Sequence, residues 1–207
     1  MNTTIYLIRH SEPFKAHRGN VRTNETILIE NEKSPLSING EKMTEKFSSK
    51  DEFKNLDVIY SSNYVRAMST AKYFASNNNL KVNIDDRFNE RIYGINSWDE
   101  LPSNFEINQF EDENYKIGFG ESQNEVQSRM YEALCDVLKE NQGKRIAIIS
   151  HSTAIAFLLQ KWCKVYYNQE YTFGNRIFFD GKWQYLETFK LTFNKEKELI
   201  DILNIKQ

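Results

Sequence analysis

The chain has 207 residues, of which 40% are hydrophobic and 14% aromatic, and its formal net charge is −2. This length favours a single domain over residues 1–207 and allows a sizeable buried core. The small net charge gives no electrostatic footprint for nucleic acid or for an anionic membrane, so we expect neither as a partner. No apolar run approaches the roughly 18 residues of a membrane span, and the first residues carry no signal-peptide pattern, which predicts a cytoplasmic protein.

The two cysteines, Cys135 and Cys163, are far apart and lack the spacing of metal ligands. We expect both to be buried free thiols within helices, as is usual in a reducing compartment. They indicate neither a metal site nor a disulfide.

The first predicted element is a buried strand, because Thr4 to Ile8 is a short apolar and β-branched run that ends at Arg9-His10. A long polar stretch over 14–35 follows, and loops of this length inside a domain are usually functional or mobile. Apolar spacing then predicts alternating elements: a helix to about residue 49, a strand over 56–60, a helix over 63–75 and a strand over 80–84.

The stretch 95–120 differs in composition, since it is turn-rich, aromatic and acidic, and it predicts an insertion or lid. Ser122 and Glu125 form a capping box that begins a helix running to about residue 140. A buried strand over 145–149 and a helix over 152–161 are predicted next.

The last part of the chain indicates antiparallel strands. Asp180-Gly181 between apolar runs predicts a hairpin turn. Alternating apolar residues continue from Trp183 to Phe193, and a final strand is predicted over 199–205. Strands that alternate with helices and then give way to an antiparallel end indicate an α/β fold with a mixed sheet.

Reactive side chains follow three of the predicted strands: Arg9 and His10 the first, Ser62 and Arg66 the second, and His151 the fourth. In a sheet with helix crossovers these strand ends meet at one edge, where α/β folds bind their ligands. Two guanidiniums and two imidazoles in one pocket repel each other unless an anion binds there. Planar guanidiniums match phosphate oxygens, so the pattern predicts a phosphate site.

These residue types divide the work of phosphoryl transfer. A neutral imidazole can attack phosphorus, while the arginines and the second imidazole stabilise charge on the equatorial oxygens. A carboxylic acid must then protonate the departing oxygen and later activate water. Glu90, just after the third strand, is the candidate by position.

Short motifs that carry this chemistry occur in order along the chain: Arg9–Glu12, Ser61–Ala67 with Thr70-Ala71, Glu90 with Gly94, Gly120–Ser122 and Ser150-His151. Together they resemble the histidine phosphatase superfamily, in its phosphoglycerate-mutase-like branch, over residues 4 to about 160. Leu36–Gly40 also resembles the family's Leu-Thr-x-x-Gly segment. The resemblance implies a three-layer α/β/α sandwich with a central, mostly parallel mixed sheet.

The same resemblance assigns roles by motif match. It implies that His10 becomes phosphorylated, that Arg9, Arg66 and His151 form the phosphate pocket, and that Glu90 is the proton donor. Neither a metal nor a cofactor is expected.

Several positions are left open. Ser11 and Ser152 stand where the family usually has glycine after each catalytic histidine, which reduces the freedom of the backbone to adopt positive φ. Ser62 could donate to phosphate or cap the following helix. Ala16 stands where the family often has asparagine, so the substrate contacts of this loop are open. The candidates there are substrate ligands or merely solvated residues: His17, Arg18 and Arg22.

The lid composition favours a phosphatase over a mutase. Residues 91–120, the lid with its leading segment, contain only the cations Arg91 and Lys116, against six acids: Asp99, Glu100, Glu106, Glu111, Asp112 and Glu113. An acidic lid would repel the second phosphate of a mutase intermediate. The lid aromatics either contact the substrate or pack the lid onto the sheet: Trp98, Phe105, Phe110, Tyr115 and Phe119.

The favoured function is therefore metal-independent hydrolysis of a phosphomonoester, with a small phosphorylated metabolite as the substrate. The alternatives are a phosphoglycerate-type phosphomutase and a non-catalytic protein that binds a phosphorylated ligand on the same fold. The sequence allows either a monomer or a homodimer.

Overall fold

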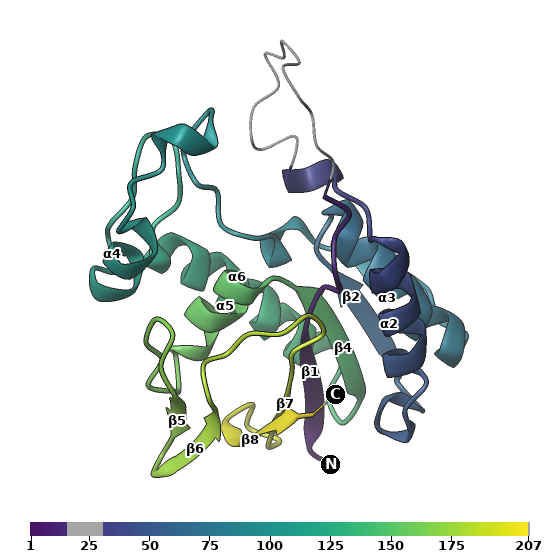
Figure 1. Ribbon diagram of the computed structural model, residues 1–207. Coiled ribbons are helices and arrows are strands. Elements are labelled where there is room, and N and C mark those ends of the chain that lie inside the picture. The colour runs from purple at the N-terminus through teal and green to yellow at the C-terminus, as the bar shows by residue number, and fades with distance from the viewer. Residues whose placement is uncertain (16–30, 207) are drawn as a thin grey trace.

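The computed structural model describes residues 1–15 and 31–206. Its central sheet has six strands in the order β3-β2-β4-β1-β7-β8 (Figure 1). Their bounds are β1 Thr3–Arg9, β2 Val58–Ser61, β3 Val82–Ile84, β4 Arg145–Ser150, β7 Thr188–Phe193 and β8 Leu199–Ile205. Strands β1 to β4 pair in parallel, whereas β7 and β8 are antiparallel additions. The predicted mixed, mostly parallel sheet is confirmed.

Helices cover both faces of this sheet, which gives three layers (Figure 1). On one face α5 (Gln123–Glu140) and α6 (Ser152–Leu159) pack on Ile5 and Leu7 of β1. On the other face α2 (Ile38–Ser48) and α3 (Val65–Asn78) pack with Tyr6 and Ile8. Because successive strand residues point to opposite faces, a strand buried on both sides has the continuous apolar pattern seen in the sequence.

Local signals set the helix starts. The Ser122 hydroxyl accepts the Glu125 N–H while the Glu125 carboxylate accepts the Ser122 N–H, so the predicted capping box is confirmed. Ser37 caps α2 in the same manner, with its side chain accepting the Gly40 N–H. Within the residues that the structure describes, none of the helices combines the length and the apolar character needed to cross a membrane.

The predicted Asp180-Gly181 hairpin is wrong. The hairpin lies earlier, between β5 (Tyr171–Phe173) and β6 (Arg176–Phe179). Gly181 instead has φ +79° and lies against the backbone of Gln169, where a Cβ would be 2.2 Å from the carbonyl oxygen. Because Gly181 has no side chain, the backbone of this segment can lie directly against that of Gln169. The glycine does not form a two-residue turn.

The predicted strand alternation from Trp183 is also too long, because β7 begins only at Thr188. Leu186 has φ +62°, which no strand residue adopts. The Trp183 ring leaves the strand pattern to pack edge-on against Phe179 and Phe189. Aromatic clustering thus replaces strand pairing in this segment.

The stretch 95–120 contains a 3-10 turn, Trp98–Glu100, and helix α4, Phe105–Glu111. Its aromatic residues divide between the two hypotheses. Phe105 is buried, and Phe110 packs on Phe157 of α6. Trp98 and Phe119 are 49% and 56% exposed.

Both cysteines are free, and Cys163 is buried as predicted. Two details differ, since Cys135 is only half-buried and Cys163 follows the end of α6 rather than lying inside a helix.

Candidate active site

The adjacent strands β2, β4 and β1 bring three distant parts of the chain together at their carboxyl ends. The His10 N–H donates to the Ser150 carbonyl at 2.9 Å, and the Ser62 N–H donates to the Ile149 carbonyl at 2.9 Å. The two histidines therefore follow neighbouring strands, and their ring centroids are 5.1 Å apart. The predicted convergence of these strand ends is what the structure shows.

Arg66, in the first turn of α3, bridges the two imidazoles. Its Nε donates to His10 Nε2 at 3.0 Å, and its Nη2 lies 3.1 Å from His151 Nδ1. All three side chains are buried. Another guanidinium nitrogen, Nη1, donates to the Asn31 carbonyl.

The hydrogen bonds assign a tautomer to each ring. Because a guanidinium only donates, His10 Nε2 must accept from Arg66 and carry the lone pair. His10 Nδ1 then carries the proton and donates it to the Ser11 carbonyl at 2.7 Å. By the same reasoning His151 accepts at Nδ1 and donates from Nε2 to Ser62 Oγ at 2.8 Å.

Burial and nearby positive charges favour the neutral form of both imidazoles. Burial is the first cause that holds the pKa of His10 well below its usual value, followed by the charges of Arg66 and Arg9. Burial and Arg66 lower the pKa of His151 in the same direction. A neutral His10 with its lone pair on Nε2 is the form that can act as a nucleophile.

Arg9 lies at the end of β1, with its guanidinium 4.9 Å from the centroid of the Tyr185 ring. Its Nη1 donates to the Trp183 carbonyl at 3.4 Å, and its Nε has no partner among the described residues. The segment after Gly181 therefore covers Arg9, a contact that the strand-alternation prediction missed.

Glu90 is held from several sides by backbone N–H groups. Its carboxylate accepts from Arg91 at 3.0 Å, from Ala154 at 3.0 Å and from Thr153 at 3.4 Å. The last two are in the first turn of α6, whose dipole favours a negative group at that end. These contacts fix the carboxyl beside the His151 loop.

Arg129 orders the segment that carries Glu90. From α5 it donates to the carbonyls of Arg87 at 2.8 Å and Asn89 at 2.9 Å, and its Nε pairs with Glu121 at 2.7 Å. Arg129 therefore has a structural role, through its ion pair with Glu121 and its hydrogen bonds to the backbone.

Ser62 does more than cap a helix. Its hydroxyl accepts from His151 and from the Tyr64 N–H at 3.2 Å, and it donates to Asn89 Oδ1 at 2.7 Å. Asn89 was not singled out from the sequence, although it directly precedes Glu90. His17, Arg18 and Arg22 lie outside the described residues.

The two serines in place of glycine need no unusual backbone, since neither Ser11 nor Ser152 has positive φ. The Ser11 hydroxyl donates to the Gly40 carbonyl at 2.8 Å, and a hydrogen bond of 3.0 Å joins the Ser11 N–H to Thr70 Oγ1. The serine side chain thus anchors the His10 loop to α2 and α3.

Several cavities in the described part of the chain border these side chains, among them a small one of about 270 Å³ beside Glu90 and Arg129 and two larger ones. One of about 550 Å³ exposes His10 and Arg66 and is also lined by Lys15, Lys33 and Trp98. The other, of about 370 Å³, lies on the side of Arg9 and Glu90, and its lining also includes Arg91, Glu106, Phe110, Ser152, Asn168 and Trp183.

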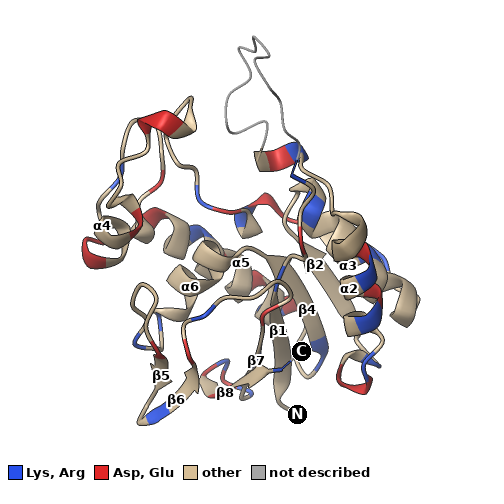
Figure 2. Cartoon of the chain, in the orientation of Figure 1, with Lys and Arg blue, Asp and Glu red and all other residues tan. Residues whose placement is uncertain are grey.

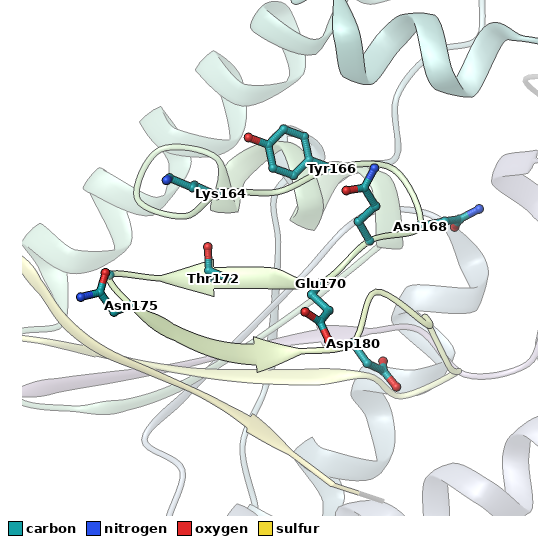
Figure 3. Close-up of a pocket in the computed structure, with 9 residues that line it drawn as sticks. Lys164, Tyr166, Asn168, Glu170, Thr172, Asn175 and Asp180 are labelled. Atoms are coloured by element: carbon teal, nitrogen blue, oxygen red, sulfur yellow. The ribbon is translucent and has the colours of Figure 1, made fainter.

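A separate cavity, of about 640 Å³, lies between the β5–β6 hairpin and the loop after α6 (Figure 3). Its polar lining includes Lys164, Thr172 and Asp180. It contains none of the strand-end residues, and it shares only Asn168 with the cavity beside Glu90.

Known proteins resemble this chain along most of its length. A probable phosphoglycerate mutase GpmB from Escherichia fergusonii is 27% identical over 167 residues, which are 75% of this chain and 72% of the relative. A solved mycobacterial glucosyl-3-phosphoglycerate phosphatase superposes with a TM-score of 0.70 at 16% identity, covering 98% of this chain and 97% of the other. A phosphoserine phosphatase from Entamoeba histolytica gives 0.64 at 19%, covering 97% and 96%.

The two structures establish the fold, and the family follows from the sequence match. The model of the histidine phosphatase superfamily (branch 1) matches residues 5–176, which include all of the strand-end residues described above. The chain therefore belongs to the histidine phosphatase superfamily, branch 1.

Proposed function

We propose that the protein hydrolyses a small phosphomonoester through a phosphohistidine formed on His10. The observation that carries the proposal is the Arg66 bridge, with Nε 3.0 Å from His10 Nε2 and Nη2 3.1 Å from His151 Nδ1. A phosphate bound to the Arg66 guanidinium can therefore contact both imidazoles. Binding the phosphate would replace these contacts with charge-assisted ones.

In the first half-reaction His10 Nε2 attacks phosphorus, and the bond from phosphorus to the ester oxygen breaks. Arg9, Arg66 and His151 stabilise the charge on the equatorial oxygens. The Glu90 carboxyl gives its proton to the departing oxygen, so an alcohol leaves. In the second half-reaction the Glu90 carboxylate takes a proton from water, which attacks phosphorus and releases His10 with inorganic phosphate.

The charges of the lid support hydrolysis rather than mutase chemistry. The two cations of residues 91–120 are already paired, Arg91 with Glu106 at 2.5 Å and Lys116 with Glu125 at 2.6 Å. Figure 2 shows acidic residues on α4 and on the turn before it. A second phosphate would thus meet excess negative charge. The similarity to a probable phosphoglycerate mutase keeps the phosphomutase as the second candidate.

The test is the hydrolysis of an aryl phosphate and of an alkyl phosphate in the presence of EDTA. We expect metal-free turnover by the wild type and a loss of at least about 10⁴-fold in His10→Ala, since removing a covalent nucleophile has effects of this order. Glu90→Gln should slow the alkyl ester about 100-fold more than the aryl ester, because a phenolate leaves without being protonated. Glu113→Gln, an exposed lid acid, is the matched control.

Mass spectrometry of the rapidly quenched enzyme should find the phosphoryl group on His10. Turnover that survives His10→Ala would overturn the nucleophile assignment. Exchange between 2- and 3-phosphoglycerate faster than phosphate release would favour the mutase. A wild type that binds phosphorylated compounds, without turnover or phosphoenzyme, would favour the non-catalytic binding protein.

A further inference from the structure

A chain of hydrogen bonds joins the proposed phosphate site to Asn89, the residue that directly precedes Glu90. His151 Nε2 donates to Ser62 Oγ at 2.8 Å, and Ser62 Oγ donates to Asn89 Oδ1 at 2.7 Å. His151 and Ser62 are completely buried, so bulk water does not compete for these hydrogen bonds. The direction of each bond therefore decides what His151 can do when a phosphate binds.

The side-chain amide of Asn89 fixes the direction of its hydrogen bond with Ser62. Asn89 Oδ1 also accepts the Asn63 N–H at 3.1 Å. Because a main-chain N–H only donates, the oxygen of the amide must lie on this side. The proton between Ser62 and Asn89 therefore belongs to the Ser62 hydroxyl, and Asn89 engages the only proton which that hydroxyl has.

Ser62 has only lone pairs left for its other two neighbours. One lone pair accepts the Tyr64 N–H at 3.2 Å, and the other accepts from His151 Nε2. Nε2 must then keep its proton, so the lone pair of the neutral ring lies on Nδ1, 3.1 Å from Arg66 Nη2. The ring is held in this orientation because it packs against the rings of Tyr64 and His10, with centroids 4.9 Å and 5.1 Å away.

A phosphate on Arg66 would face a lone pair of His151. An oxygen bound to the guanidinium lies next to Nδ1, which has no proton to donate in the neutral ring. Two changes could supply one. The Ser62 hydroxyl could turn towards Nε2 and leave the proton of the ring on Nδ1, but the bond to Asn89 would be lost. Alternatively, His151 could take up a second proton, and the resulting imidazolium would make a charge-assisted hydrogen bond to the phosphate.

The surrounding charges favour the second proton only when an anion is bound. In the free protein, burial and then the charge of Arg66 hold the pKa of His151 well below its usual value. A dianion on Arg66 offsets this positive charge and raises the pKa of the imidazole. The titratable and charged groups around the ring are His10 and Arg9 at the end of β1, Tyr64 and Arg66 at the start of α3, Arg129 on α5, and Glu90.

We propose that Asn89 is a positioning residue that directs the Ser62 hydroxyl away from His151, so that a bound phosphate is stabilised by a doubly protonated His151. Binding then brings one proton to Nδ1, and the imidazolium donates from Nδ1 to the phosphate and from Nε2 to Ser62. This inference rests on the proposed phosphatase function, and it adds a positioning residue and a protonation state to the phosphate site.

Calorimetry with inorganic phosphate and with sulfate at about pH 7 would count the protons. Sulfate is the sharper probe, because it does not itself take up a proton near this pH. Titrations in two buffers with different enthalpies of ionisation should give an uptake of about one proton per bound sulfate.

Nitrogen NMR of histidine-labelled protein would locate that proton. Both ring nitrogens of His151 should be protonated in the sulfate and phosphate complexes, with the signals assigned by their loss in His151→Gln. An unprotonated nitrogen of His151 in the complexes would overturn the proposal, even if a proton is taken up elsewhere, for example on Glu90.

Two substitutions test the part of Asn89. Asn89→Leu removes the acceptor and frees the Ser62 hydroxyl to donate to His151, so proton uptake should fall to near zero. We expect kcat/KM for the aryl phosphate to fall about 10-fold, since a neutral donor replaces a charged one. Asn89→Asp keeps an acceptor oxygen and should keep the uptake near one proton. The main-chain contacts at this position, to Arg129 at 2.9 Å and to the Asp86 carbonyl at 3.0 Å, do not depend on the side chain.

Asn77→Leu on α3 is the matched control, because it also removes an amide that hydrogen-bonds to a serine hydroxyl, Ser48 Oγ at 2.9 Å. It should change neither the proton uptake nor kcat/KM. If Asn89→Leu does not fold, Ser62→Ala removes the hydroxyl itself and should likewise abolish the uptake.

The outcomes separate failure of this inference from failure of the phosphatase proposal. Proton uptake that stays near one in Asn89→Leu would overturn the role of Asn89, and a loss of kcat/KM alone would then show a structural role. If neither anion bound and the aryl phosphate were not hydrolysed, the phosphatase proposal itself would be rejected.

Discussion

The two ends of the proposed site are built differently. At the phosphate end, His10, His151 and Arg66 come from strand ends and a helix start that pack in the core, and they hydrogen-bond to one another. At the other end, beside Glu90, Arg91 is buried and its guanidinium pairs with Glu106 of the segment 95–120. We therefore expect the strand ends of the sheet to carry the chemistry of the reaction and the lid to affect which ester is accepted.

The largest effect that would test this comparison is expected at its phosphate end. Arg66→Met should lower kcat/KM about 10³-fold on every substrate, because it removes a preorganised charge and the contacts that align both imidazoles. Steady-state kinetics on the aryl phosphate and on phosphoserine would measure it. Lys72→Met, on the exposed side of the same helix, is the control.

If the loss of kcat/KM in Arg66→Met differed strongly between the two substrates, the proposed difference between the two ends of the site would be contradicted. It would place Arg66 in recognition of the leaving group instead of in phosphate binding.

The free energy of unfolding should be more sensitive to substitutions in the sheet than to substitutions in the lid. Ile148 is buried in β4, so Ile148→Ala should cost about 2–5 kcal/mol of unfolding free energy through lost burial and a new cavity. Ile107 on α4 is 43% exposed, and Ile107→Ala should stay within about 0.5 kcal/mol. Urea titrations of both variants would measure this. Equal losses would mean that the lid packs as firmly as the sheet.

The smallest predicted effect concerns protonation. Since burial and Arg66 depress the pKa of His10 and His151 in the folded protein, both imidazoles should stay neutral as the pH falls through about 6.5, where an unfolded chain takes up protons. The unfolded state then binds more protons, so these two groups make the free energy of unfolding fall below that pH.

Nitrogen NMR of labelled histidine would follow each ring in the free protein. An imidazole at His10 or His151 that titrates at 6.5 or above would contradict the burial and charge argument. In Arg66→Met we expect both midpoints to rise, since a neighbouring positive charge is removed.

Much of the fold could be predicted from local patterns. The apolar run before Arg9 gave a strand, the Ser122 capping box began a helix, and the alternation of strands and helices indicated the parallel part of the sheet. Local prediction failed at Asp180-Gly181, where the glycine is needed for an approach to Gln169. A two-residue turn and a close contact between distant segments both require a glycine, so the local sequence does not distinguish them.

The strand-end residues and their meeting at one edge of the sheet could be predicted from the sequence, because helix crossovers place parallel strands with their carboxyl ends together. The tertiary structure alone decided how those residues touch: Arg66 lies between two imidazoles, and the Tyr185 ring lies beside Arg9. The tertiary structure also places the buried Arg91 next to Glu106. The spacing of apolar residues in the sequence reflects the periodicity of each helix or strand. Contacts between these side chains depend instead on how segments far apart in the chain pack together.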